Sequence, residues 1–169
     1  MDVQIRDLHK AFDGKPVLQG LSLDIPPRRV TLVVGASGCG KSVLLKHIIG
    51  LMRPDRGKVV VDGQDITHLP ERQLVPLRQR FGMVFQGGAL LGSMSVFDNL
   101  ALGMREKMWR TRPRLRSQRD VIRDTVRRNL ELVGLEGVER QMPASLSGGM
   151  RKRVAIARAL CMDPEIFLY

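Results

Sequence analysis

The spacing of apolar positions predicts three strands in the first part of the chain. Residues 3–8 and 17–25 alternate between apolar and polar side chains, the pattern of a half-buried strand. Residues 58–61 form a third such segment, and the Asp62-Gly63 pair after them is typical of the turn in a β-hairpin. These segments favour an antiparallel β layer.

Other apolar runs predict strands that are buried on both faces, because no polar position interrupts them. They are residues 30–34, 81–85 and 166–169. Helical spacing of apolar residues is found in 41–49, where Gly50 ends the helix, in 95–133 and in 150–160. The alternation of strands and helices predicts an α/β fold with a helical subdomain inserted into it.

A glycine-rich loop lies between the run at 30–34 and the helix at 41–49. It matches the phosphate-loop pattern G-x-x-x-x-G-K-[ST], with the candidate nucleotide-binding residues Gly35, Ser37, Gly38, Cys39, Gly40, Lys41 and Ser42. Glycines let successive backbone N–H groups approach a polyphosphate, and the helix N-terminus after them favours an anion. Lys41 is expected to bind the β- and γ-phosphates, and the Ser42 hydroxyl is expected to bind Mg²⁺.

A second candidate anion site precedes the helix at 150–160. Ser147 is expected to cap this helix, with Gly148 and Gly149 and a basic first turn after it.

The net charge of +11 raises the question of nucleic-acid binding. Much of the charge lies between Arg105 and Arg128, where acidic residues interrupt it and Trp109 is the only aromatic nearby. A solvated helical face is the preferred interpretation, and anionic lipid headgroups could lie near it. The two cysteines, Cys39 and Cys161, lack metal-binding spacing and are expected to be reduced thiols.

Together, the phosphate loop and the segment at 147–149 make the sequence resemble the ATP-binding subunits of ABC transporters, and the resemblance extends over essentially all of its length. Residues 146–150, LSGGM, resemble the signature motif of that family, although Met150 departs from the commoner glutamine. The resemblance implies a P-loop NTPase (RecA-like) core with an antiparallel β subdomain and an inserted helical subdomain. It also implies a head-to-tail homodimer that encloses ATP and Mg²⁺ between the phosphate loop of one subunit and the signature of the other.

The resemblance assigns roles to two further residues. Phe12 corresponds to the aromatic that stacks on adenine, although a lone phenylalanine is more often a core residue. Gln86 corresponds to the glutamine that contacts Mg²⁺ and the attacking water and signals to the membrane subunit. The implied domains are 1–86 with 161–169 for the β subdomain and core, and 87–160 for the helical subdomain.

The family's catalytic glutamate and switch histidine have no counterpart here. The chain ends at Tyr169, directly before the acidic pair that the resemblance leads us to expect, so the fold is expected to be incomplete at its C-terminus. Glu165 lies at the wrong end of its strand to be the catalytic base, and His9, His47 and His68 are interpreted as surface or packing residues. We expect residues 1–169 to bind nucleotide without hydrolysing it efficiently.

Met150 and the segment 85–100 resemble the ATPases of bacterial Mla or MCE-type phospholipid-trafficking systems. This implies an integral membrane permease and a lipid-binding MCE protein as partners, and a place on the cytoplasmic face of the inner membrane. The alternatives are an importer of amino acids or other small solutes, and a non-transport ABC ATPase that acts on nucleic acid or ribosomes. The spacing from Ser42 to Ser147 contains no sustained heptad repeat, which disfavours the DNA-repair type, and no nucleic-acid partner is expected.

Overall fold

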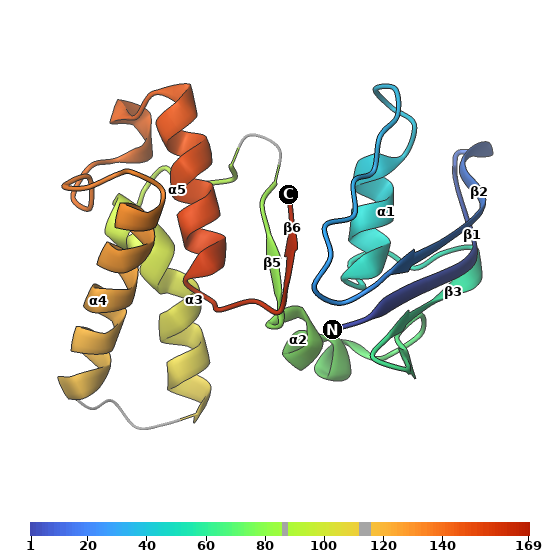
Figure 1. Ribbon diagram of the computed structural model, residues 1–169, viewed down its shortest axis with the longest axis horizontal. Helices are drawn as coiled ribbons and strands as arrows, with labels where there is room; N and C mark the ends of the chain where they lie inside the picture. The colour runs from blue at the N-terminus through green and yellow to red at the C-terminus, as the bar shows by residue number, and fades with distance from the viewer. Residues whose placement is uncertain (86–87, 112–115) are drawn as a thin grey trace. The chain divides into compact units, whose positions relative to one another are not determined.

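The computed structural model describes residues 1–85, 88–111 and 116–169. The chain forms two compact units, Met1–Gln79 and Arg80–Tyr169 (Figure 1). Each unit is described by itself.

The first unit is built on a four-stranded antiparallel sheet in the order β2-β1-β3-β4. Its strands are β1 (Val3–Phe12), β2 (Lys15–Ile25), β3 (Arg56–Val61) and β4 (Gln64–Asp65). The register pairs Val3 with Ile25 on one side and with Val61 on the other, so β1 is central. Val3, Ile5 and Val59 are fully buried. The three strands predicted from alternation are therefore confirmed.

Two short helices complete this unit. Helix α1 (Lys41–Ile48) buries Leu44 and Ile48, as its apolar spacing requires, and lies beside the sheet (Figure 1). Helix α2 (Glu71–Arg78) meets the C-terminal end of α1. There the Arg78 guanidinium donates to the carbonyl oxygens of Ile49 at 3.1 Å and Gly50 at 2.7 Å, two of the acceptors that a helix end leaves unpaired.

The prediction that residues 30–34 form a buried strand is wrong. This segment has no regular structure, and Val30 is 98% exposed. A strand buried on both faces requires neighbouring strands along both edges and layers above and below. Within the Met1–Gln79 unit, the described sheet has four strands and none of them pairs with residues 30–34. An apolar run thus shows that a segment can be buried, but whether it is buried depends on neighbouring strands and layers.

The second unit packs three helices around one apolar core. Helices α3 (Val96–Thr111), α4 (Arg116–Leu132) and α5 (Gly148–Leu160) each contact the other two, and a 3₁₀ turn, η1 (Pro143–Ser145), precedes α5. Each helix contributes an apolar stripe at three- or four-residue spacing, and the buried members are Val96, Leu100, Met104, Ile122, Val126, Leu130, Val154, Ala157 and Cys161. The predicted helices are confirmed.

A two-stranded parallel sheet completes this unit. Strand β5 (Phe81–Met83) pairs with β6 (Ile166–Leu168), with Phe81 opposite Ile166. Leu168 is buried, whereas Phe167 and Tyr169 are exposed. Both predicted strands are present, but β5 ends at Met83, short of the predicted 81–85, and Phe85 is exposed. The full burial expected for 81–85 and 166–169 is wrong, because the described sheet offers each strand one neighbour.

Asn99 fixes the loop that enters α3. The side chain is 1% exposed, and its Nδ2 lies 3.0 Å from each of three carbonyl oxygens, those of Leu91, Met94 and Ser95. Its Oδ1 accepts a hydrogen bond from the Leu91 N–H at 2.8 Å. One buried amide thus satisfies backbone groups of the whole turn.

We predict that Asn99→Ala lowers the free energy of unfolding by about 2–3 kcal/mol, because three carbonyls and the Leu91 N–H lose a buried side-chain partner. Urea denaturation of the whole protein measures this. Asn129→Ala is the matched control: Asn129 donates to Thr125 O, a carbonyl inside α4, and bonds to the Cys161 thiol, so this smaller set of contacts predicts a loss of about 1 kcal/mol. Equal losses in the two variants would contradict the role given to Asn99.

Candidate functional site

The phosphate-loop residues 35–40 lead directly into α1. Gly40 is the residue before the helix and has φ 99°, a left-handed conformation that glycine adopts without strain. A Cβ at Gly40 would lie 3.0 Å from side-chain atoms of both Val17 and Leu18 in β2. The loop is therefore seated against the β1–β2 hairpin at this point, and Lys41 and Ser42 begin the helix.

The Lys41 side chain folds back over the loop. Its Nζ donates to Gly35 O at 2.7 Å and to Ala36 O at 2.8 Å, and lies 3.8 Å from Cys39 Sγ. Residues 35–39 and Ser42 are exposed, so their backbone and the Ser42 hydroxyl face solvent. A cation and an accessible turn of backbone are thus gathered at one helix N-terminus.

The hairpin that contacts Gly40 also carries Phe12. This side chain is 40% exposed at the end of β1, where Phe12 pairs with Lys15. The Lys10 Nζ lies 5.6 Å from the centre of the ring. The ring is therefore a surface aromatic, accessible to a planar ligand, and not a core residue.

Asp55 holds this end of the hairpin in place. Its carboxylate accepts from Lys10 Nζ at 2.6 Å and from Ala11 N at 2.7 Å. The hydrogen bond from Lys10 is the main cause that lowers the pKa of Asp55, and it leaves the carboxylate ionised at neutral pH.

The three histidines lie at surface and packing positions, as the sequence predicts. His47 is buried on α1, where its Nδ1–H donates to Val43 O at 2.7 Å and burial lowers its pKa. His9 bonds to Asp7 Oδ1 at 2.9 Å, and His68 is exposed.

Ser147 caps α5, as the sequence predicts. Its Oγ accepts a hydrogen bond from Met150 N at 3.2 Å. A Cβ at Gly149 would meet nothing within 4 Å, and at Gly148 it would only approach the tip of Arg151 at 3.9 Å. The first turn of α5 therefore offers an open glycine surface beside a capping hydroxyl.

Gln86 lies outside the described residues, but the two positions that follow Gly87 are described and pack on α5. A Cβ at Gly88 would lie 3.3 Å from Ala155 Cβ. The Arg158 guanidinium donates to Ala89 O at 2.7 Å and to Gly88 O at 3.1 Å, and burial lowers its pKa. The contact made by Arg158 is not predicted by the sequence. The pattern that could have indicated it is an arginine among small apolar residues of a helix. An arginine at such a position requires a hydrogen-bond acceptor within the protein.

Glu165 has a structural partner. Both of its carboxylate oxygens accept from Arg80, at 2.6 and 2.8 Å, and its N–H donates to Arg80 O at 2.8 Å. This pairing joins the beginnings of β5 and β6.

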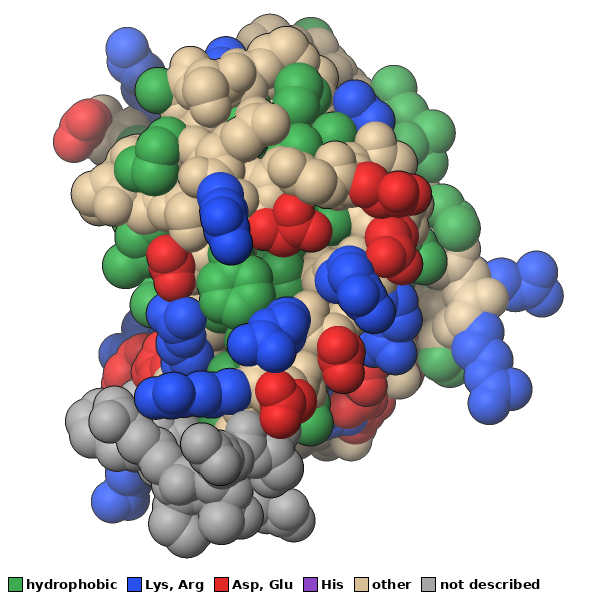
Figure 2. Space-filling model, turned by 90° about the vertical axis from the view of Figure 1, so that its left-hand side faces the viewer, with side chains coloured by type: hydrophobic (Ala, Val, Ile, Leu, Met, Phe, Trp, Pro, Cys, Tyr) green, Lys and Arg blue, Asp and Glu red, His purple; other side chains and the backbone are tan. Residues whose placement is uncertain are grey.

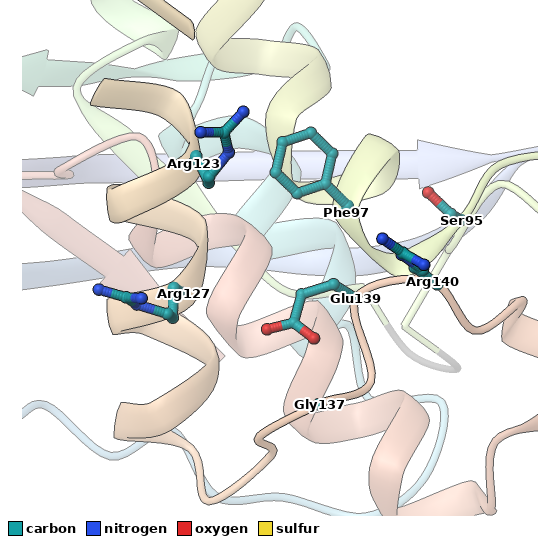
Figure 3. A pocket seen from close by; sticks show the side chains of 7 residues that line it. All are labelled: Ser95, Phe97, Arg123, Arg127, Gly137, Glu139 and Arg140. Carbon is teal, nitrogen blue, oxygen red and sulfur yellow. The ribbon is translucent and has the colours of Figure 1, made fainter. Parts of the chain in front are cut away.

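The outer face of the helical unit carries an open depression of about 720 Å³. Phe97 from α3 and Arg123 and Arg127 from α4 face it, together with Glu139 and Arg140 from the loop after α4 (Figure 3). Basic and acidic side chains alternate around exposed apolar groups on this side of the molecule (Figure 2). The chain's positive charge is therefore interrupted here, as the sequence predicts.

The structure groups the candidate residues in two sets. Phe12 and the phosphate loop belong to the first unit, and Ser147, Gly148 and Gly149 belong to the second. Among the residues described, no cluster of three metal-ligating side chains is present, both cysteines are free, and no helix is long and apolar enough to cross a bilayer. Burial raises the pKa of the Cys161 thiol to about 12.

The chain is 43% identical over 166 residues to the "Probable ribonucleotide transport ATP-binding protein mkl" of Mycobacterium leprae, covering 98% of this chain and 46% of that protein. It is 38% identical over 167 residues to the "Intermembrane phospholipid transport system ATP-binding protein MlaF" of Escherichia coli K12, covering 99% and 60%. The chain thus spans about half the length of these relatives.

Among solved structures, the dimeric post-hydrolysis state of the ATP-binding cassette MJ0796, bound to ADP and Pi, aligns with a TM-score of 0.85 and 28% identity. The alignment covers 98% of this chain and 72% of that one. The sequence profile of the ABC transporter family matches residues 18–169. The chain belongs to the ABC transporter family, and its fold is that of the family's P-loop ATPase cassettes.

Proposed function

We propose that this chain is the nucleotide-binding part of an ATPase subunit that drives an ABC transporter, and that the transported substrate is phospholipid. The observation that carries the proposal is the phosphate loop, which gathers an ammonium, a hydroxyl and exposed backbone at the start of α1. The names of the relatives, which are ATP-binding proteins of transport systems, support the same class.

In the proposed site, ATP phosphates take the place of the Gly35 and Ala36 carbonyls as acceptors for Lys41. A charge-assisted bond to phosphate is stronger than one to a neutral carbonyl, so the exchange favours binding. The Ser42 hydroxyl would supply one oxygen for Mg²⁺ and Gln86 a second, and phosphate oxygens and water suit the other positions around this ion. The metal's chemistry is charge neutralisation on the phosphates. The exposed Phe12 ring gives adenine a face on which to stack.

The signature glycines support a second copy as the partner. Neither φ nor neighbouring atoms of this chain require glycine at 149, so an approaching molecule would explain it. The MJ0796 cassette is described as dimeric and bound to ADP and Pi. We propose a head-to-tail homodimer in which Ser147, Gly148 and Gly149 contact the nucleotide held by the other subunit.

Hydrolysis is proposed for the whole protein, with Gln86 orienting water and contacting Mg²⁺. Phosphoryl transfer depends on a positioned nucleophile and balanced charge. We infer that residues 1–169 alone hold nucleotide without efficient turnover.

The interleaved charges around Phe97 support a protein partner over nucleic acid, since a polyanion would meet Asp98, Asp120 and Glu139 as well as arginines. The proposed partners are a membrane permease, at the cytoplasmic face of the inner membrane, and an MCE protein.

We predict that Lys41→Ala weakens ATP binding roughly ten- to a hundredfold, the range for loss of a charge-assisted hydrogen bond. Titration of the whole protein with a fluorescent ATP analogue and Mg²⁺ measures this. Lys46→Ala removes the same charge from the exposed last turn of α1 and should bind as the wild type does. Wild-type affinity in Lys41→Ala would refute the proposed phosphate site.

We predict that Gly149→Ala preserves the fold and single-subunit ATP affinity but weakens ATP-dependent dimerisation roughly tenfold or more, because one obstructing methyl costs about 1–3 kcal/mol. Sedimentation with and without ATP gives the dimer fraction. Gly92→Ala adds a methyl to a site that is equally open and should dimerise normally. Equal behaviour of the two variants would count against the signature contact.

The substrate test uses the whole protein purified with its permease and reconstituted in vesicles. We predict ATP-dependent movement of a fluorescent phospholipid between membranes, with no uptake of labelled ribonucleotide or amino acid. Ribonucleotide transport is the second candidate, because of the name of the mycobacterial relative. Its uptake without lipid movement would replace the phospholipid proposal and leave the ATPase proposal intact. Co-purification with ribosomes in place of a permease would overturn the transport proposal and favour a non-transport ABC ATPase.

A further inference from the structure

The segment 88–89 is bound to α5 by one side chain, that of Arg158. Its Nη1 donates to Ala89 O at 2.7 Å and its Nη2 to Gly88 O at 3.1 Å, across about seventy residues of sequence. A guanidinium fork can donate to two successive carbonyls at once, whereas the ammonium of lysine is a single point charge. The contact is therefore specific to arginine.

This bound segment has a backbone conformation that needs support. Gly88 and Ala89 have φ 82° and 45°, two successive residues in the left-handed region, and Ala89 is not a glycine. The Gly88 N–H donates to Phe85 O at 2.8 Å, and Gly88 packs against Ala155, one helical turn before Arg158. Residues 88–89 thus lie on one face of α5, which Ala155 and Arg158 share.

The same helix begins at the signature motif. Ser147 caps α5, and the 13 residues Gly148–Leu160 form one uninterrupted helix from that cap to Arg158. A helix transmits the displacement of one end to the other because its hydrogen bonds keep it rigid. A change in the position of Ser147 therefore carries Arg158 and the carbonyls bound to it.

We propose that Arg158 is a positioning residue that ties the chain directly after Gln86 to the signature helix. Binding of the signature to a nucleotide then adjusts the segment that carries Gln86, without Arg158 touching substrate. The catalytic consequence rests on the proposed ATPase function; the contact itself does not.

The test compares Arg158→Ala, Arg158→Lys and Arg153→Ala in the whole protein. Arg153 is the matched control, because it lies on the same helix and also donates to two carbonyls, those of Val133 and Gly134, away from segment 88–89. The measurements are ATP affinity, kcat and KM of ATP hydrolysis, and hydrogen exchange of amides 88–92. Thermal unfolding of each variant confirms that it is folded.

For Arg158→Ala we expect ATP affinity within about twofold of wild type, kcat lower by roughly tenfold or more, and faster exchange at the Gly88 amide. Arg158→Lys should lie between, and Arg153→Ala should retain wild-type kcat and exchange. Wild-type kcat in Arg158→Ala, or an equal loss in Arg153→Ala, overturns the positioning role. If the wild-type protein hydrolyses no ATP, the proposed function fails, and unchanged exchange in Arg158→Ala would separately refute the contact.

Discussion

Backbone carbonyls at the ends of helices and in tight loops lack partners within their own segment, and long cationic side chains supply them throughout this chain. Four such side chains each donate to two neighbouring carbonyl oxygens: Lys41, Arg78, Arg153 and Arg158. Two of the acceptor pairs follow helices, Ile49-Gly50 after α1 and Val133-Gly134 after α4. The last turn of a helix leaves such acceptors unpaired, and a desolvated carbonyl without a donor is costly. Two of these contacts, those of Lys41 and Arg158, are made by the phosphate loop and by segment 88–89.

This use of cations changes the meaning of the net charge of +11. A cation whose tip binds a carbonyl needs no carboxylate partner, so it can raise the net charge while serving the fold. Arg78 has both kinds of partner, because it also pairs with Glu71. The acceptors of Lys41, Gly35 and Ala36, lie in an exposed loop. A phosphate can therefore compete with those two carbonyls for Lys41, whereas the contact of Arg158 with Gly88 is partly buried and less open to a phosphate.

The sequence predicted the features that depend on nearby residues. Glycine at 40 and serine at 147 determine a helix start through one turn of chain, and the apolar stripes of α3, α4 and α5 repeat within each helix. It did not predict the exposure of residues 30–34, because burial depends on strands elsewhere in a sheet. Nor did it predict Arg158, whose acceptors are about seventy positions away. The domain limits and the role of Gln86 stay predictions.

Glycine is needed for different reasons in the phosphate loop and in the segment after Ser147. At Gly40 the chain itself requires glycine, since φ is 99° and a Cβ would press on Val17 and Leu18. At Gly149 the backbone is helical and the space is open, so alanine would fit and would favour the helix by about 1 kcal/mol. A residue that lowers helix stability at an exposed first turn, with no internal reason, indicates a surface that another molecule approaches closely. Folding thus explains glycine at 40, whereas no described neighbour requires glycine at 149, which supports the proposed contact with a second copy.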